Sequence, residues 1–570
     1  MLPINQNNFK AALSSLSVLV KRGHTPSDVV FAILSRWMAL VTPDLHRPPL
    51  QRKLAKESAI SAFANWLNET DILTGAFWLS SAYAALLDKT QRKESAMYFT
   101  PPYLSQRILD NAGEHLFKGK IIDPACGGAA FLAPVALRIA TKLYSDGKSS
   151  KAILAYIENN LYGVDSDQVL CKLSASFLKM VLADHILAAG YEPILNVHCD
   201  NGLQVFNDEL GTFHLVLCNP PYRKLNSEEF IPYINTYGHI VRGQPNLYAL
   251  FFLKTITILS PEGLGVLLTP MSFISGQSFS KLRQSLSTQG NIRRLDLIHD
   301  KTGVFLGAEQ DAVITTWCKD KNSTTPAEVF SLTTGGDVKY SGKLSVDKSG
   351  AAWPTPRVAA DSQYIPLFVN RKHDLKSYGF VVRTGSIVVH RDPRKRYKSL
   401  RLNHKKTIVP MLWQSDIKQS GIIDIKQPPK DRDRYVDMKT LESPSIVKKP
   451  AIAMQRVTSD GQLHRLICAP VPKDIQKQYG GVVGENHVCF IESLSGANSV
   501  DYLLLCSILR TKVLDRLFRC VSGATNVSAY ELNQLPLPDP NLVSSAISRG
   551  FDIEEATMIG FGLKECHGLS

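Results

Sequence analysis

A strand-like apolar run leads directly into four residues that can hold an amino group. The run Phe213 to Cys218 is followed by Asn219-Pro220-Pro221-Tyr222. Two prolines after a buried strand stop the sheet and fix a stiff, extended turn with few backbone donors, so its acceptors face outward. The side-chain oxygen of Asn219 and the backbone carbonyl of Pro220 can therefore accept both hydrogens of one planar amino group.

An amino group held in this way is prepared for attack on an electrophilic carbon. Its nitrogen shifts toward tetrahedral geometry, which is positioning joined to electrostatic preorganisation and needs no covalent intermediate with the protein. The ring of Tyr222 offers a face on which a planar base can stack, a contact worth about 1 to 3 kcal/mol. The alternative is a proline turn that only closes a strand. We assign the chemistry to Asn219, Pro220, Pro221 and Tyr222.

A turn of small residues upstream is suited to a ligand with an anionic group. Asp123 to Ala129 lies between a predicted strand and a predicted helix, Phe131 to Tyr144. Small residues let the backbone approach a ligand closely, and the amino end of a helix offers free N–H groups to a carboxylate. An ordinary tight turn is the alternative. The residues assigned to cofactor binding here are Asp123, Ala125, Cys126 and Gly127.

Two further carboxylates follow predicted strands. Asp165 ends the strand that begins at Leu161, where a carboxylate can accept both hydroxyls of a ribose. Asp200 follows the next strand and is suited to accept a hydrogen bond from an adenine amino group. Each aspartate could instead be a turn residue. Together with the turn at Asp123, they predict a nucleoside cofactor.

The elements that position these residues divide the chain into three predicted domains. Residues 1–95 show apolar spacing of three and four, which predicts a helical N-terminal extension. Residues 96–325 alternate short apolar strands with amphipathic helices, which predicts βαβ units and a mainly parallel sheet. Residues 326–570 form an α+β C-terminal domain beyond a stretch rich in Lys, Ser, Thr, Gly and Pro.

The predicted strands of the middle domain are Lys120 to Ile122, Leu161 to Val164, Ile194 to His198, Leu215 to Cys218, Gly265 to Thr269 and Ala312 to Thr316. In the C-terminal domain we predict strands at Phe380 to Val382, Ile387 to His390, Ala451 to Met454 and Val482 to Ile491, and one helix at Val500 to Cys520.

The formal net charge of +14 is concentrated in one part of the chain. Between residues 371 and 450 there are 20 Lys and Arg against 8 Asp and Glu, a difference of +12. A solvated basic face is the simple interpretation, and a footprint for a phosphate backbone is the functional one. The residues proposed to bind DNA are Arg391, Arg394, Lys395, Arg396, Lys398, Arg401, Lys405 and Lys406.

Cysteine spacing and hydropathy predict neither a metal site nor a membrane anchor. The 10 cysteines form no Cys-x-x-Cys pair, so we expect free thiols and no bound metal. No stretch approaches 18 uncharged apolar residues, and the first 20 residues lack the features of a signal peptide. We therefore expect a cytoplasmic protein.

The ordered motifs resemble the γ class of adenine-N6 DNA methyltransferases of bacterial type II restriction-modification systems. Asp123 to Phe131 is similar to the class's Asp-Pro-x-Cys-Gly-Ser-Gly turn, and Asn246 to Phe251 is similar to a helix that follows the Asn-Pro-Pro-Tyr motif. Tyr98 to Pro102 resembles the class motif that contacts the cofactor. The resemblance implies a Rossmann-like α/β domain that binds S-adenosyl-L-methionine.

The same resemblance implies roles for further residues. Tyr98, Thr100 and Pro101 would contact the methionine part of the cofactor, Asn219 would also bind the cofactor, and Phe305 would pack against a flipped adenine. The looser similarity of Gly480 to Val488, Ser522 to Thr525 and Leu535 to Pro538 implies a target-recognition domain. The implied partners are double-stranded DNA and a separate cognate restriction endonuclease. The recognised bases do not follow from the sequence.

Two positions depart from the class pattern. The class has Ser-Gly where this chain has Gly128-Ala129, a change that is compatible with cofactor binding if Ala129 has helical dihedrals. Asn201 stands where the class often has an apolar ring against the cofactor adenine. The runner-up function is methylation of protein glutamine or ribosomal RNA, since the tetrapeptide suits any planar amino group. A catalytically silent DNA-binding subunit is the third.

Overall fold

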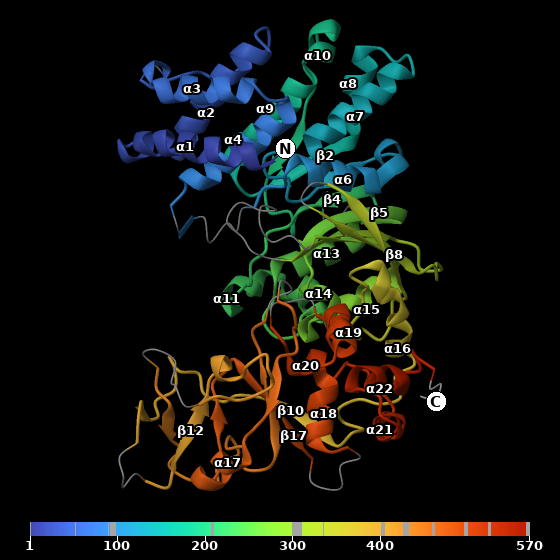
Figure 1. Ribbon diagram of the computed structural model, residues 1–570. Helices are drawn as coiled ribbons and strands as arrows, with labels where there is room; N and C mark the ends of the chain where they lie inside the picture. Colours follow the sequence, from blue (N-terminus) through green and yellow to red (C-terminus); the bar gives the residue numbers. More distant parts are fainter. Residues whose placement is uncertain are drawn as a thin grey trace. The chain divides into compact units, whose positions relative to one another are not determined.

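The computed structural model divides into two compact units. One comprises residues 1–273 and 278–351, and the other comprises residues 274–277 and 352–570. The structure describes residues 2–51, 53–88, 90–91, 98–206, 210–298, 311–333, 336–400, 405–425, 432–458, 462–494, 500–522 and 526–565. Figure 1 shows the helices and strands of each unit.

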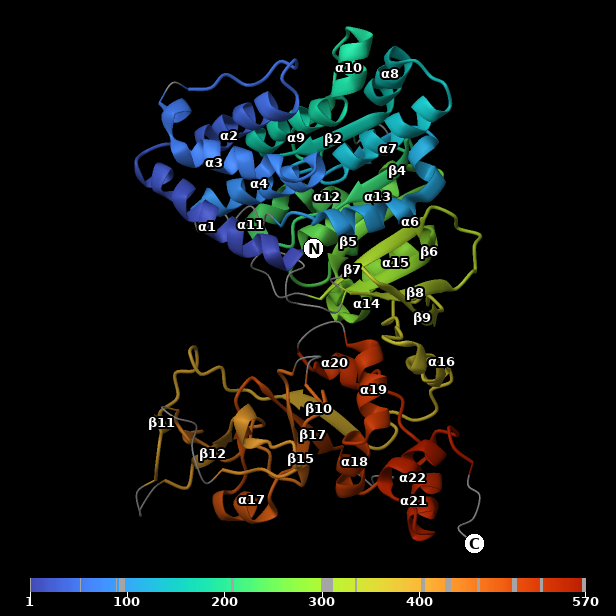
Figure 2. The same cartoon turned by 45° about the horizontal axis from the view of Figure 1, so that its top comes forward.

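Four long helices open the first unit, as the apolar spacing predicted. They are α1 (Leu2–Lys21), α2 (Pro26–Val41), α3 (Ser58–Asn68) and α4 (Ile72–Leu86). The side chains of Thr25 and Asp71 accept hydrogen bonds from backbone N–H groups in the first turns of α2 and α4, which fixes where these helices begin. Their buried residues belong to the same hydrophobic core as the strands of the sheet, so the N-terminal helices pack as part of the first unit (Figure 2).

The sheet of the first unit has nine strands in the described part of the chain, in the order β3-β2-β1-β4-β5-β7-β6-β8-β9. Strands β1 to β5 pair in parallel, whereas β7 runs antiparallel to β5 and β6. The strands are β1 (Ile121–Asp123), β2 (Leu161–Asp165), β3 (Asn196–Cys199), β4 (Phe213–Cys218), β5 (Leu259–Pro270), β6 (Asn291–Ile298), β7 (Ala312–Cys318), β8 (Ala327–Leu332) and β9 (Val338–Leu344). The predicted α/β fold is confirmed.

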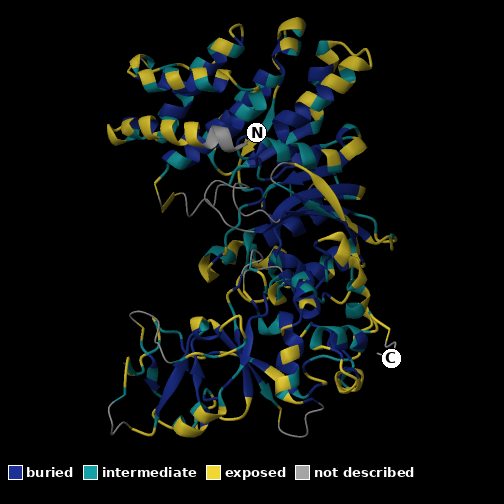
Figure 3. Ribbon diagram, in the orientation of Figure 1, coloured by how far each residue is buried: buried dark blue, intermediate teal, exposed yellow. Residues whose placement is uncertain are grey.

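Helices connect the parallel strands and cover the sheet, whose strands are largely buried (Figure 3). They are α6 (Pro102–Ala112), α7 (Leu132–Ser145), α8 (Ser150–Asn160), α9 (Gln168–Val181), α10 (Ala183–Ala189), α11 (Ser227–Phe230), α12 (Ile234–Tyr237), α13 (Leu247–Ile258), α14 (Ser272–Ser275) and α15 (Ser280–Gln289). The strand order proceeds from β1 to β2 in one direction and from β4 to β5 in the other. Because crossovers are right-handed, the direction of winding reverses between β1 and β4, where such sheets bind ligands.

The first unit extends further than the expected boundary at residue 325. Strand β8 pairs in parallel with β6, and β9 pairs antiparallel with β8, so both belong to the nine-stranded sheet. The composition of this stretch had predicted a domain boundary. Strand β9 lies at the edge of the sheet and exposes Lys339 and Lys343, as edge strands commonly expose charged side chains.

The second unit contains two four-stranded sheets in its described residues, ordered β10-β17-β14-β15 and β11-β13-β12-β16. The strands are β10 (Phe380–Thr384), β11 (Arg396–Tyr397), β12 (Ile408–Leu412), β13 (Tyr435–Asp437), β14 (Ala451–Gln455), β15 (Cys468–Pro470), β16 (Val483–Gly484) and β17 (Val488–Ser493). The helices are α16 (Ile365–Val369), α17 (Lys473–Tyr479), α18 (Tyr502–Leu509), α19 (Lys512–Val521), α20 (Ala529–Leu532), α21 (Pro540–Ser548) and α22 (Ile553–Gly560).

Three predictions for the second unit need correction. Residues 387–390 form no strand, because the N–H groups of Arg391 and Asp392 both donate to the carbonyl of Val388 and turn the chain. Residues 482–491 hold two strands separated by a turn rather than one. The single helix expected at 500–520 is broken before Thr511, whose side chain accepts from the N–H of Leu514 and starts a new helix.

No described helix is long and apolar enough to cross a membrane.

Candidate active site

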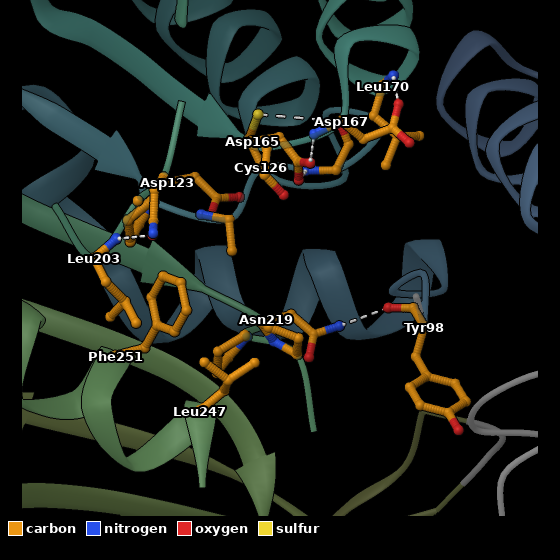
Figure 4. Close-up of a pocket in the computed structure, with 18 of the residues that line it drawn as sticks. Tyr98, Asp123, Cys126, Asp165, Asp167, Leu170, Leu203, Asn219, Leu247 and Phe251 are labelled. Carbon is orange, nitrogen blue, oxygen red and sulfur yellow. Dashed lines mark hydrogen bonds between the residues drawn. The ribbon is translucent and has the colours of Figure 1, made fainter. Parts of the chain in front are cut away.

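A cavity of about 690 Å³ lies where the winding of the sheet reverses. It is lined by residues that follow β1, β2, β3 and β4, and by Leu247 and Phe251 of α13. In Figure 4, Asp123, Asp165 and Asp167 lie on one side of the cavity, across from Asn219. The volume is within the range of about 300 to 1,000 Å³ that small-molecule sites occupy.

Asp123 organises the small-residue turn after β1. Its side chain is buried, and its Oδ1 accepts a hydrogen bond from the N–H of Ala125 across 3.0 Å. Burial raises the pKa of this carboxyl well above its ordinary value. Ala125, Cys126 and Gly127 all line the cavity, as expected from the sequence.

The backbone of this turn differs from the expectation at Ala129. Its φ is 58°, so it has left-handed rather than helical dihedrals. Its N–H donates to the carbonyl of Cys126 across 3.0 Å and closes the turn, which places the left-handed residue before the first turn of α7. Gly127 is also left-handed, with a φ of 51°. The turn therefore keeps two left-handed residues, one of which carries a Cβ atom.

Asp165 joins the turn after β1 to the turn after β2. Its Oδ2 accepts from the N–H of Gly127, and its Oδ1 accepts from the N–H of Asp167, each across 2.9 Å. Burial raises the pKa of Asp165 to about 6, although both hydrogen bonds oppose that shift. The carboxylate lies at the carboxyl edge of the sheet and lines the cavity, where the sequence placed a ribose ligand.

Asp200 is not where the sequence predicted it. Its side chain is exposed, is not part of the cavity lining formed by the described residues, and accepts from the N–H of Asn201 across 2.6 Å. The cavity is lined instead by Asn201, Gly202 and Leu203. A Cβ atom at Gly202 would lie 1.8 Å from the carbonyl oxygen of Pro124, so only glycine fits there. The turn after β3 approaches the cavity with its backbone, and the carboxylate of Asp200 points elsewhere.

The amide of Asn219 is held from one side. Its Nδ2 donates to the carbonyl of Tyr98 across 3.1 Å and to Oγ1 of Thr100 across 3.0 Å. A carbonyl only accepts, so the amide nitrogen must face Tyr98. The Oδ1 atom of Asn219 is buried and has no hydrogen-bond partner among the described residues. A buried acceptor left unpaired costs about 1 to 3 kcal/mol, so a ligand that donates a hydrogen bond to it would be favoured.

The other predicted residues of this motif take different positions. Pro220 and Pro221 line the cavity. Tyr222 is not among its lining residues in the described chain. The hydroxyl of Tyr222 donates to the carbonyl of Leu268 across 3.0 Å, and its ring stacks on that of Tyr98 with centroids 6.2 Å apart. Pro101 is buried at the start of α6 and also lies outside the lining.

Several residues that line the cavity were not predicted, because no pattern in the sequence marks them. Phe251 and Leu247 belong to a helix that is apolar on all sides, so no periodicity marks which residues reach the site. Tyr233 accepts a hydrogen bond from Nδ2 of Asn201 across 2.8 Å, and it comes from the short helices after the catalytic motif. Such contacts join distant segments and are visible only in the fold.

The eight basic residues of the second unit are not equivalent. Arg391, Lys395, Lys398, Lys405 and Lys406 are exposed. Arg394 forms an ion pair with Asp392, and Arg396 lies 3.4 Å from a carboxylate oxygen of Asp433, so their charges are partly neutralised within the chain. Arg401 lies outside the described residues, as does Phe305 of the first unit.

Comparisons with known proteins agree with this geometry. The family model described as Eco57I restriction-modification methylase matches residues 159–305. The type II methyltransferase M.BsuBI of Bacillus subtilis is 21% identical over 487 residues, which span 80% of this chain and 89% of that protein.

Two solved structures share the fold. The type IIL restriction-modification enzyme MmeI in complex with DNA has a TM-score of 0.54 at 11% identity and covers 95% of this chain and 87% of its own. The DrdV–DNA complex has a TM-score of 0.50 at 10% identity and covers 91% and 64%. The predicted resemblance to restriction-modification methyltransferases is confirmed, and the cofactor expected from it is S-adenosyl-L-methionine.

The residues present fit that cofactor. Oδ1 of Asn219 is a polar atom at the cavity wall without a partner in the described part of the chain. The backbone at Gly202 lies close to the carbonyl of Pro124, so the cavity is narrow there and has no room for a side chain at position 202. Asp165, Gly127 and Phe251 all line the cavity, where Asp165 would accept from the ribose, the turn at Gly127 would bind the carboxylate, and Phe251 would contact the adenine ring. Within the described residues, no group of three or more His, Cys, Asp or Glu side chains could hold a metal ion.

Proposed function

We propose that this chain, which resembles restriction-modification methyltransferases, methylates the N6 amino group of an adenine in duplex DNA. The observation that carries the proposal is the amide of Asn219, whose nitrogen is engaged by Tyr98 and Thr100 while its oxygen stays unpaired. That arrangement leaves a fixed acceptor at the cavity wall. It suits a planar amino group, which donates two hydrogens, and it disfavours a thiolate, which has none to donate.

Asn219 and Pro220 orient the acceptor amino group. Oδ1 of Asn219 accepts one amino hydrogen and the carbonyl of Pro220 accepts the other, so the nitrogen lone pair is directed away from both. The hydrogen bonds from Asn219 Nδ2 hold the amide before substrate arrives, so little reorganisation is needed during the reaction. This preorganisation is the chain's main contribution to the rate.

The bound cofactor supplies an electrophilic methyl group on a sulfonium. The methyl carbon would bond to the nitrogen lone pair as its bond to sulfur breaks, and the nitrogen, held by Asn219 and Pro220, would then release one proton to solvent. Gly127, Asp165 and Phe251 line the cavity and would hold the cofactor. Leu247 and Phe251 give this part of the cavity an apolar lining.

The second unit is proposed as the target-recognition and DNA-binding part of the enzyme. Its exposed Arg391, Lys395, Lys405 and Lys406 present positive charge to a phosphate backbone. The target adenine must leave the base stack to reach Asn219, at a cost of about a few kcal/mol. We assign the stacking contacts that offset this cost to Tyr222 and Phe305.

A separate restriction endonuclease that cuts the same site would be the functional partner. Methylation by this chain would then protect host DNA from that cleavage. Plasmid isolated from cells that express the chain should resist the matching nuclease, and plasmid from cells that express an inactive Asn219→Ala variant should not.

The direct test incubates the purified protein and S-adenosyl-L-methionine with unmethylated plasmid and maps the modified bases. N6-methyladenine at one recurring sequence is expected. Methyl groups on cytosine N4, or on protein glutamine or ribosomal RNA with none on adenine, would refute the proposed acceptor. Because cytosine N4 is also a planar amino group, the mapping must distinguish the two bases.

A further inference from the structure

Helix α4 of the N-terminal extension lies directly behind the turn that follows β1. Ser80 is buried, and a Cβ atom at Gly128 would lie 1.9 Å from its Oγ and 2.7 Å from its Cβ. Gly128 lines the cavity and does not have a positive φ. Glycine is therefore needed at 128 for space, because Ser80 occupies the place of a side chain.

A second contact from the same helix reaches the turn after β2. The hydroxyl of Tyr83, which is 5% exposed, donates to Oδ2 of Asp167 across 2.9 Å. The Oδ1 of Asp167 accepts from the N–H groups of Val169 and Leu170 at the start of α9. Both oxygens of Asp167 are thus engaged, and its side chain is fixed between α4 and α9.

The position of Asp167 determines the position of Asp165. The N–H of Asp167 donates to Oδ1 of Asp165, whose Oδ2 accepts from the N–H of Gly127. A continuous series of hydrogen bonds therefore runs from Tyr83 through Asp167 and Asp165 to Gly127. Its last three members, Asp167, Asp165 and Gly127, line the cavity.

We propose that α4 is part of the cofactor site, with Ser80 and Tyr83 as positioning residues that set the Gly127–Gly128 backbone and the Asp165 carboxylate against S-adenosyl-L-methionine. The inference rests on the proposed placement of the cofactor at these two turns. It gives the N-terminal extension a defined role in binding S-adenosyl-L-methionine. An extension that made no contact with the turns after β1 and β2 would have no such role. Packing of Trp37 against Phe177, with ring centroids 6.1 Å apart, further joins α2 to α9.

The first experiment measures cofactor affinity by isothermal titration calorimetry of the full chain without nucleic acid, so that the identity of the methyl acceptor plays no part. Tyr83→Phe removes one hydroxyl, and we expect affinity about three- to tenfold weaker. Tyr156→Phe is the matched control, because it loses a comparable hydrogen bond, to the carbonyl of Phe117, away from the cavity. Equal affinities for Tyr83→Phe and the control would overturn the role of Tyr83.

The second experiment tests the fit between Ser80 and Gly128 by compensation. Gly128→Ser alone should weaken binding by about tenfold or more, because its side chain meets Ser80. Gly128→Ser combined with Ser80→Gly should recover most of the affinity of Ser80→Gly alone. A double variant that binds no better than Gly128→Ser would overturn the proposal.

If Gly128→Ser fails to fold, the same pair of variants remains decisive. The double variant should then yield folded protein that binds S-adenosyl-L-methionine, because Ser80→Gly removes the obstruction. A double variant that also fails to fold, although Ser80→Gly folds by itself, would contradict the inference. Failure of the proposed adenine methylation would leave both binding results unchanged, so the two proposals can be distinguished.

Discussion

The Nδ2 atom of Asn219 lies 3.1 Å from the carbonyl oxygen of Tyr98 and donates a hydrogen bond to it. This contact connects the motif after β4 with a segment 121 residues earlier in the chain. It fixes which end of the amide faces the cavity, because the carbonyl can only accept. The proposed chemistry depends on that orientation.

The stability of the cofactor-free protein should depend on the protonation of Asp165. Burial raises its pKa to about 6, whereas in the unfolded chain it is near about 3.9. Between these values the native chain retains a proton that the unfolded chain has released, so this group's contribution to the free energy of unfolding falls as pH rises. Relative to Asp165→Asn, the wild type should lose thermal stability from about pH 4 to about pH 6.

Thermal unfolding of both proteins across this pH range measures the effect. Asp123 and Asp296 also have raised pKa values, mainly through burial, and they contribute the same sign to both proteins. Taking the difference between wild type and variant removes the contribution of Asp296, whereas part of the Asp123 contribution remains, because the charge of Asp165 also raises the pKa of Asp123. A difference that does not change with pH would contradict the assignment of a raised pKa to Asp165.

Substitution of Gly202 by alanine should impair cofactor binding. The added Cβ would lie 1.8 Å from the carbonyl oxygen of Pro124, which is backbone and cannot move without shifting the turn after β1. We expect affinity for S-adenosyl-L-methionine to fall by about tenfold or more, since misplacement by about 1 Å has large effects at such sites. Gly238→Ala is the control, because its Cβ would meet only Ile234 at 3.8 Å. Equal affinities of the two variants for S-adenosyl-L-methionine would contradict the proposed importance of the close contact between Gly202 and the carbonyl of Pro124.

Phe251 should contribute ring contact to the cofactor adenine. It is 6% exposed and lines the cavity across from Asp123 (Figure 4). Phe251→Leu keeps most of the apolar volume and removes the aromatic face, which is worth about 1 to 3 kcal/mol per stacked base. Affinity for S-adenosyl-L-methionine should fall accordingly, whereas affinity for a cofactor fragment without adenine should not. A loss shared by both ligands would indicate a general packing defect.

Exposed lysines of the second unit should account for part of the salt dependence of DNA binding. Lys405→Ala and Lys406→Ala should each weaken binding to duplex DNA and reduce the slope of log affinity against log salt by about 0.9. Lys477→Ala, exposed on α17 of the same unit, is the control and should leave the slope unchanged. Fluorescence anisotropy at several salt concentrations measures these slopes. Equal slopes for all three variants would remove the basic segment from the DNA interface.

The sequence predicted the parts of the site that depend on strand order. Asp123, Asp165 and Asn219 each follow a buried parallel strand, and the carboxyl ends of such strands must meet at one edge of the sheet. The misplaced Asp200 follows a strand that is largely exposed, so burial does not constrain its side chain. The left-handed Ala129 was missed because local pattern assigns that conformation to glycine.

Other features required tertiary contacts that no local pattern contains. Strand β9 is a largely exposed strand at the edge of the sheet, and β8 lies beside it, in a stretch whose composition predicts a domain boundary. The break before Thr511 depends on a side-chain cap within a region that is apolar enough for one long helix. The role of Ser80 and Tyr83 arises from packing between α4 and turns more than 40 residues away.

The rate of methyl transfer to adenine N6 by Asn219→Ala, at saturating cofactor and DNA, tests the central claim most directly. Loss of one preorganised hydrogen-bonding group at a reacting centre typically costs about 10² to 10³ in kcat, and we expect a loss of that size. Asn160→Ala, which removes an amide bonded to the carbonyl of Tyr156 away from the cavity, should keep the wild-type rate. Full activity of Asn219→Ala would contradict the proposed mechanism.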